Sequence, residues 1–243
     1  MTARHFSSVY TSACCAFGLL SMVALTPPLL GATAGAPPAP VAPQADPQLD
    51  AAVAKVQAAY ATFESFRADF SQTMRSGGLS KSRVDTGVVE LKKGGKMHWE
   101  FKTPDARHFI SDGKTLWIYS VADRQALSTP LAGNTSATAL NFMAGLGELK
   151  RDFDVSLATE PEFRRVGTVA LHLVPKESLG MVKRLTIVAD AADGRVREAH
   201  LLDPMGTSTR MEFLNIQMNE KLEEARFTFK APEGVTVIPA GNF

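Results

Sequence analysis

The chain has little cysteine, no excess of either charge and no familiar catalytic motif. Its two cysteines, Cys14 and Cys15, both lie near the beginning of the 243 residues. A domain formed by the rest of the chain must therefore be stable without disulfide bonds. Of the 26 Lys and Arg residues, only Arg4 precedes residue 35, which leaves 25 bases against 25 acids from there on. This balance argues against nucleic acid or an anionic membrane surface as a partner.

Sequence signatures of catalysis are missing as well. There is no Gly-x-Ser-x-Gly elbow, Walker loop, Gly-x-Gly-x-x-Gly turn or His-Glu-x-x-His pair. His98 and Glu100 lie two residues apart on one strand face, but a metal site needs three or four ligands. His172 and His200 stand alone in expected strands. We therefore expect no enzyme activity, no metal and no cofactor, with an exported hydrolase built from distant residues as an open alternative.

The first 34 residues resemble a secretory signal peptide. An apolar run over residues 13–30 is cut by Pro27-Pro28, which leaves it shorter than the roughly 20 residues of a membrane-spanning helix. The small residues of 31–34 that follow, which end at Ala34, suit a signal peptidase. We expect cleavage after Ala34, a Pro- and Ala-rich linker over residues 35–46 and one folded domain over residues 47–243.

Strand patterns dominate this expected domain. A helix comes first, because Leu49, Val53, Val56 and Tyr60 recur at spacings of three and four residues. The Asp112-Gly113 pair between apolar runs predicts a hairpin, and a short helical segment is expected over Ser136–Leu149. The expected strands are Phe66–Arg75, Val84–Leu91, Met97–Phe101, the two strands of the hairpin, Arg124–Thr129, Phe153–Leu157, Thr168–Val174, Val182–Ala189, Arg195–Leu202, Thr207–Ile216 and Arg226–Phe229.

These elements predict a mainly β fold. About ten or eleven antiparallel strands, each with one apolar face, would form a curved sheet or an incomplete barrel. The helices would cover its apolar side.

The residues of this pattern also resemble a known family, the periplasmic outer-membrane lipoprotein carriers called LolA. The resemblance covers residues 50–238 and is most specific in the hairpin. It is carried by Phe66-x-Ala68-x-Phe70-x-Gln72, Lys96-x-x-Trp99-Glu100-Phe101, Ile110-Ser111-Asp112-Gly113-Lys114-x-Leu116-Trp117-x-Tyr119 and Ala225-x-Phe227-x-Phe229.

The resemblance implies a periplasmic chaperone that shields the acyl chains of lipoproteins between the two membranes. Its partners would be acylated lipoproteins, an ATP-driven transporter that releases them from the inner membrane, and a receptor in the outer membrane. It would act as a monomer without a cofactor. A related open barrel that binds a lipid or glycolipid, or senses envelope stress, remains the alternative.

The resemblance also implies the site. The family fold is an incomplete antiparallel β-barrel closed by a helical lid, which here would be the segment in the middle of the chain. The acyl chains would contact an apolar face and this lid, and a Lys-Arg-Pro sequence in the family latches the lid with its Arg. This chain has Lys92-Lys93-Gly94 there, so Lys93 would be the latch. The alternatives are that the apolar residues are ordinary core and that Lys93 is an exposed turn residue. The expected acyl-binding residues are Phe70, Met74, Leu91, Met97, Trp99, Phe101, Leu140 and Met143.

Overall fold

The structure is a computed structural model that describes residues 46–76, 82–131, 149–177 and 182–239. It begins with the expected helix, α1 (Pro47–Ala61). The carboxylate of Asp46 caps this helix, because it accepts hydrogen bonds from the amides of Gln48 and Leu49 at 2.9 and 3.3 Å. No helix in the described ranges is both long and apolar enough to cross a membrane.

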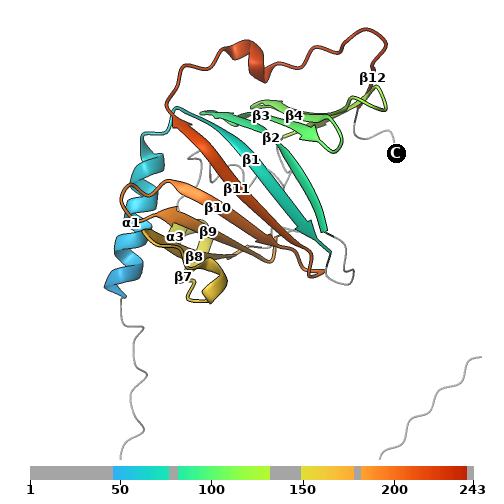
Figure 1. Cartoon of the computed structure of the whole chain (residues 1–243). Coiled ribbons are helices and arrows are strands. Elements are labelled where there is room, and N and C mark those ends of the chain that lie inside the picture. The colour runs from blue at the N-terminus through green and yellow to red at the C-terminus, as the bar shows by residue number, and fades with distance from the viewer. Residues whose placement is uncertain (1–45, 77–81, 132–148, 178–181, 240–243) are drawn as a thin grey trace, which may run out of the picture. The chain divides into compact units, whose positions relative to one another are not determined.

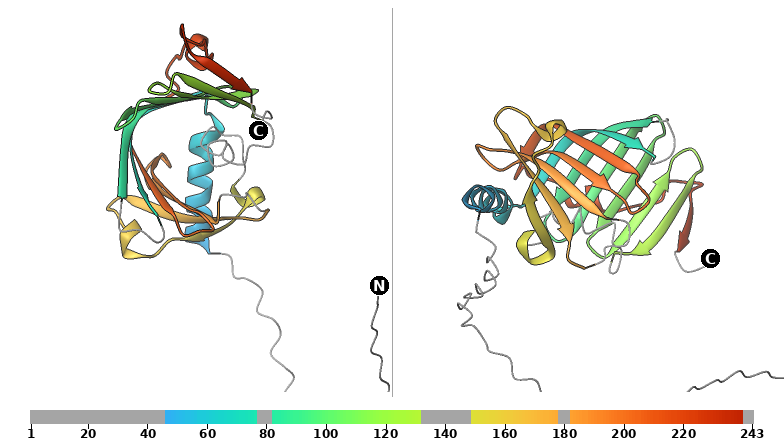
Figure 2. Two further views of the ribbon diagram at one scale, coloured as in Figure 1. Left: turned by 90° about the vertical axis from the view of Figure 1, so that its right-hand side faces the viewer. Right: turned by 90° about the horizontal axis from the view of Figure 1, so that it is seen from below.

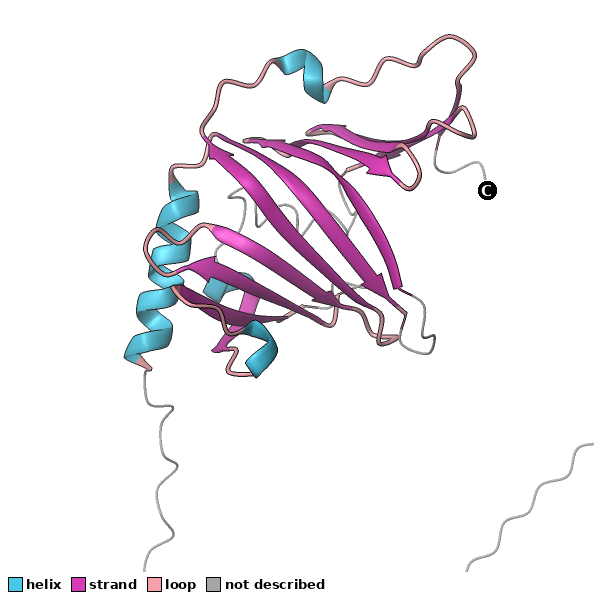
Figure 3. Ribbon diagram, viewed as in Figure 1, coloured by secondary structure: helices cyan, strands magenta, loops and turns pink. Residues whose placement is uncertain are grey.

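Within the described residues, twelve strands form one open sheet (Figures 1 and 3). Their order is β12-β6-β5-β4-β3-β2-β1-β11-β10-β9-β8-β7, so β12 and β7 are its two edges. The strands are β1 (Ser65–Arg75), β2 (Ser82–Lys92), β3 (Lys96–Thr103), β4 (Arg107–Asp112), β5 (Thr115–Ser120), β6 (Gln125–Pro130), β7 (Phe153–Leu157), β8 (Thr168–Pro175), β9 (Arg184–Asp190), β10 (Val196–Leu202), β11 (Ser208–Met218) and β12 (Thr236–Pro239).

The expected fold class is confirmed: the protein is mainly β, and its sheet is curved and open rather than a closed barrel. Most neighbours along the sheet are also neighbours along the chain. The exceptions include β1, which pairs with β11 and so joins the two halves. The hairpin between β4 and β5 forms as expected, because Gly113 has a φ of 94° and the Asp112 carboxylate accepts two backbone amides at 2.8 Å.

Two details of the expected sheet are wrong. The last of the twelve strands in the described residues, β12, runs parallel to β6, although only antiparallel strands were expected. The expected strand Arg226–Phe229 is replaced by a 3₁₀ turn, η2 (Glu224–Phe227). Phe227 and Phe229 alternate as in a strand, but this segment lies across the sheet, where Phe227 is 1% exposed and Phe229 packs on Trp117.

The expected helical segment Ser136–Leu149 lies outside the described residues except for its last residue. Leu149 is buried and begins the short helix α3 (Leu149–Asp152). A further 3₁₀ turn, η1 (Pro161–Phe163), connects β7 to β8.

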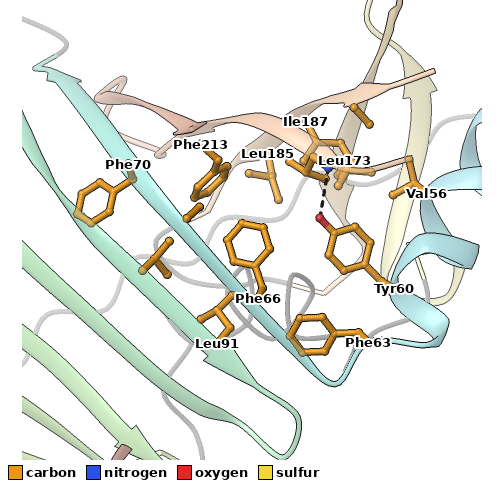
Figure 4. Packing of buried hydrophobic residues seen from close by; sticks show 14 of the residues in the cluster. Val56, Tyr60, Phe63, Phe66, Phe70, Leu91, Leu173, Leu185, Ile187 and Phe213 are labelled. Atoms are coloured by element: carbon orange, nitrogen blue, oxygen red, sulfur yellow. Dashed lines mark hydrogen bonds between the residues drawn. The ribbon is translucent and has the colours of Figure 1, made fainter. Parts of the chain in front are cut away.

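The two faces of the sheet differ sharply, and we name them by what their side chains contact. The inner face is the one whose side chains join the main hydrophobic core together with Val53, Val56 and Tyr60 of α1. Figures 1 and 2 show that the sheet is curved and that this helix lies at one open end of the curve. The Tyr60 hydroxyl accepts a hydrogen bond from the Val196 amide at 3.3 Å (Figure 4), which ties α1 to the start of β10. The opposite face is called the outer face.

Candidate functional site

An aromatic cluster occupies the inner face of β1 and β3. The ring of Phe70 lies 5.1 Å from that of Trp99 and 5.0 Å from that of Phe101, both in edge-on arrangements. Gly87 of β2 lies between these strands, paired with Phe70 on one side and with Phe101 on the other. A Cβ at this position would come within 1.9 Å of the Glu100 carbonyl oxygen and 2.8 Å of the Phe70 ring. The cluster therefore depends on a glycine that leaves room for it.

Leu91 and Met97 extend the apolar surface beyond the cluster. They face each other across β2 and β3, and their exposures are 1% and 5%. Phe213 extends this surface to β11, since its ring makes a T-shaped contact at 5.6 Å with Phe66 and lies 6.5 Å from Trp99. Phe213 is not among the site residues expected from the sequence, because only the long-range pairing of β1 with β11 brings it here.

The second half of the sheet continues this surface. Side chains from β8 and β9 meet those of β1 and α1 in the core (Figure 4). The cluster thus spans strands on both sides of the β1–β11 pair, and the members from β8 and β9 are Leu171, Leu173, Leu185 and Ile187.

One end of the inner face is polar. Asp85 is 1% exposed, and its carboxylate contacts the guanidinium groups of Arg83 and Arg107 at 2.9 and 3.1 Å. The Arg107 guanidinium also stacks 4.1 Å above the Phe101 ring. Because each charge in this group has a partner, the apolar surface ends in a compensated ion cluster rather than in an open charge.

The expected acyl-binding residues do not all lie together. Phe70, Leu91, Met97, Trp99 and Phe101 share the core of the inner face. By contrast, Met74 is 38% exposed near the end of β1 and is not part of that cluster. The other two expected residues, Leu140 and Met143, lie outside the described residues.

Lys93 lies at the end of β2, beside the turn into β3. Its ammonium group is 3.3 Å from the Glu64 carboxylate, and its backbone amide donates to the Glu64 carbonyl at 3.0 Å. The side chain is 62% exposed. The carbonyls that Lys93 was expected to hold belong to the segment outside the described residues, so its role as a latch stays a prediction.

In contrast to the apolar inner face, the outer face carries charged and polar side chains. Glu90 is 2% exposed and accepts hydrogen bonds from Arg67 at 2.5 Å and from Arg226 of η2 at 2.6 Å. His98 and His108 contact each other at 3.1 Å between Nε2 and Nδ1. Burial lowers the pKa of both rings, and the neighbouring His108 lowers that of His98 further.

His98 and Glu100, whose spacing raised the possibility of a metal site, belong to this outer face. No group of three or more His, Cys, Asp or Glu in the described ranges is arranged to hold a metal ion. A cavity of about 570 Å³ does lie between β3–β5 and the C-terminal segment, lined in part by His98, His108, Tyr119 and Phe229. It is separated from the aromatic cluster by the sheet itself.

Fold and site together define a protein with one curved β-sheet, whose broad apolar face packs with a helix at one end of the curve. The chain matches the family model of the outer membrane lipoprotein carrier protein LolA over residues 61–230, and it belongs to this family.

Individual proteins show the same relationship. An outer-membrane lipoprotein carrier protein from Azotobacter vinelandii is 29% identical over 176 residues, which cover 72% of this chain and 82% of the relative. One from Chromobacterium violaceum is 29% identical over 195 residues, or 80% of this chain and 90% of the relative. The crystal structure of an uncharacterized conserved protein from Thermus thermophilus has a TM-score of 0.50 at 14% identity. It matches 79% of this chain and 99% of its own length, and it shows the shared fold.

Proposed function

We propose that this protein is a periplasmic carrier that shields the acyl chains of lipoproteins on their way to the outer membrane. The observation that carries the proposal is the apolar inner face of Phe70, Leu91, Met97, Trp99 and Phe101 in a chain of the LolA family. Each methylene group of an acyl chain costs about 0.8 kcal/mol in water. A protein with several acyl chains therefore needs such a surface to cross an aqueous compartment.

The rest of the proposal concerns location and partners. Residues 1–34 direct export and are removed, residues 35–46 form a linker, and residues 47–243 carry the lipoprotein. N-terminal sequencing of the exported protein tests this, with Gly35 as the expected first residue. The cargo comes from an ATP-driven transporter in the inner membrane and goes to a receptor in the outer membrane. Family membership and the apolar face support a carrier rather than an enzyme.

The test places one charge on each face of the sheet. Met97→Glu puts a carboxylate on the inner face, where Met97 is 5% exposed, and desolvation of that charge opposes an apolar ligand. Val84→Glu is the matched control, because Val84 is 51% exposed on the outer face of β2. Binding of a synthetic diacylated lipopeptide is measured by isothermal titration calorimetry, with far-UV circular dichroism as a check of folding.

We expect Val84→Glu to bind as the parent does, and Met97→Glu to fold but lose at least about tenfold in affinity, equivalent to about 1.4 kcal/mol. Parental affinity of a folded Met97→Glu would show that the inner face is ordinary core and does not take the acyl chains. An equal loss in both variants would point to a general effect of charge.

A further inference from the structure

Among the described residues of the inner face, one buried hydrogen-bond donor has no acceptor. Trp99 is 4% exposed, and its indole Nε1 is buried without any hydrogen-bond partner. Buried tryptophan N–H groups ordinarily find an acceptor, because an unpaired donor forfeits its bond to water. This donor lies on the surface that is proposed to receive acyl chains.

The side chains around this indole N–H are aromatic or aliphatic. Trp99 packs against the rings of Phe70 and Phe213 and belongs to the same hydrophobic cluster as Met97 and Phe101. None of these side chains offers an oxygen acceptor. The buried polar side chains of the inner face near this cluster are already engaged: the Asp85 carboxylate contacts two arginines, and the Ser111 Oγ accepts a hydrogen bond from the Gly113 amide at 3.0 Å. The described residues therefore leave the Trp99 N–H free to pair with a bound molecule.

The other buried unpaired donor in the described residues differs from this one. It is Nε of Arg210 on the outer face, whose guanidinium already contacts Glu212 at 2.7 Å and Glu198 at 3.2 Å. Arg210 thus retains charged partners. The indole N–H of Trp99, by contrast, is an unpaired donor within an apolar surface. Such a site suits a ligand that consists mostly of hydrocarbon and carries a single hydrogen-bond acceptor.

We propose that the indole N–H of Trp99 donates a hydrogen bond to the carbonyl oxygen of an acyl group in the bound lipid. The inference rests on the proposed function and narrows its ligand class to acyl chains linked through an ester or amide. An alkyl chain linked through an ether lacks this carbonyl and offers only its ether oxygen, which is a weaker acceptor. Trp99 is thus a specificity-determining residue that distinguishes acyl from alkyl lipids.

The experiment uses the fact that the chain has two tryptophans, Trp99 and Trp117. Trp117 lies on the outer face, where its ring is 6.2 Å from that of Phe229. Trp117→Phe is therefore the matched control for Trp99→Phe. Affinities are measured for an ester-linked diacylglycerol and for the ether-linked dialkylglycerol with chains of equal length.

We expect the parent and Trp117→Phe to bind the ester about tenfold more tightly than the ether, the ratio that corresponds to about 1.4 kcal/mol. We expect Trp99→Phe to bind both lipids equally. In Trp117→Phe the single remaining indole N–H proton resonance should move downfield with the ester lipid and less with the ether lipid.

Equal affinities of the parent for both lipids would overturn the inference and leave the carrier proposal standing. Absence of binding of either lipid to the parent would overturn the carrier proposal and this inference with it. Should Trp99→Phe fail to fold, a tryptophan analogue with sulfur in place of the indole N–H can replace Trp99 alone in the Trp117→Phe protein. This analogue keeps the ring shape, and it must abolish the preference for the ester if the inference holds.

Discussion

Strand β3 presents two different environments on the two sides of one backbone. Trp99 and Phe101 point to the inner face and are buried among rings and aliphatic groups. His98 and Glu100 alternate with them and point to the outer face, where His98 meets His108. The inner face is therefore stabilised by the removal of apolar surface from water. The outer face is stabilised by directional contacts between polar groups.

The C-terminal segment accounts for this difference on the outer side. It crosses β3 and β4 before β12 pairs with β6 (Figures 1 and 3). Arg226 binds the buried carboxylate of Glu90, while Phe227 is buried and Phe229 contacts Trp117 and Tyr119. A piece of the chain itself thus covers the outer face of these strands, whereas the proposed ligand surface is the apolar inner face.

The largest effect is expected from a cavity on the inner face. Phe70→Ala should lower the free energy of unfolding by about 3 to 5 kcal/mol, because the ring that contacts Trp99 and Phe101 is lost. Ser71→Ala, one residue further on the outer face, should change it by less than about 0.5 kcal/mol. Urea unfolding measures both, and similar losses in the two variants would contradict the distinction between the faces.

A smaller loss is expected when the C-terminal segment is released from the outer face. Glu90→Gln should lower the free energy of unfolding by about 1 to 2 kcal/mol. The loss is moderate because the side chains of Arg67 and Arg226 are 37% and 44% exposed and can turn to water. Hydrogen exchange at the Phe227 amide should accelerate. Glu223→Gln is the control, and an unchanged exchange rate in Glu90→Gln would show that other contacts hold the segment.

The pH dependence of the folding stability should come from histidine side chains on the outer face. Burial lowers the pKa of His98, His108 and His200 below the ordinary value of 6.5, so the folded protein favours their neutral forms. In acid the unfolded chain binds more protons at these rings. Their contribution to stability is therefore fully present above about pH 6.5 and is lost as the pH falls through the lowered pKa values.

Thermal unfolding between pH 7.5 and pH 5 measures this loss. His98→Gln and His108→Gln should each weaken the dependence of the unfolding temperature on pH. The inner-face variant Met97→Leu should keep the parental dependence. A parental slope in both histidine variants would assign the effect to other groups.

The smallest effect on stability is expected at Lys93. Both partners of its ion pair with Glu64 are more than 60% exposed, so Lys93→Leu should change the free energy of unfolding by less than about 0.5 kcal/mol. If Lys93 is a latch, Lys93→Leu should slow lipoprotein transfer to the receptor and Glu64→Leu should not. Equal transfer rates in the two variants would leave Lys93 as the exposed partner of Glu64.

Local sequence patterns predicted most of the strands but failed in the C-terminal segment, at Phe227, Phe229 and β12. The spacing of Val53, Val56 and Tyr60 was sufficient for α1, and alternation along residues 66–75 was sufficient for β1. Alternation failed at Phe227 and Phe229, because two aromatic residues that pack on a sheet from outside repeat like those of a strand. The parallel pairing of β12 with β6 joins segments more than 100 residues apart, and no local signal marks it.

The sequence by itself determined the mainly β class, the helix at the start of the domain and the apolar alternation of Phe70, Met97 and Trp99. These are local properties, because a period of two or of 3.6 residues decides which side chains share a face. Only the tertiary structure decided that Gly87 makes room for the aromatic cluster, that Phe213 joins it and that Trp99 is left with an unpaired N–H. Each of these depends on which strands become neighbours, and strand order follows from the burial of the whole sheet rather than from any one segment.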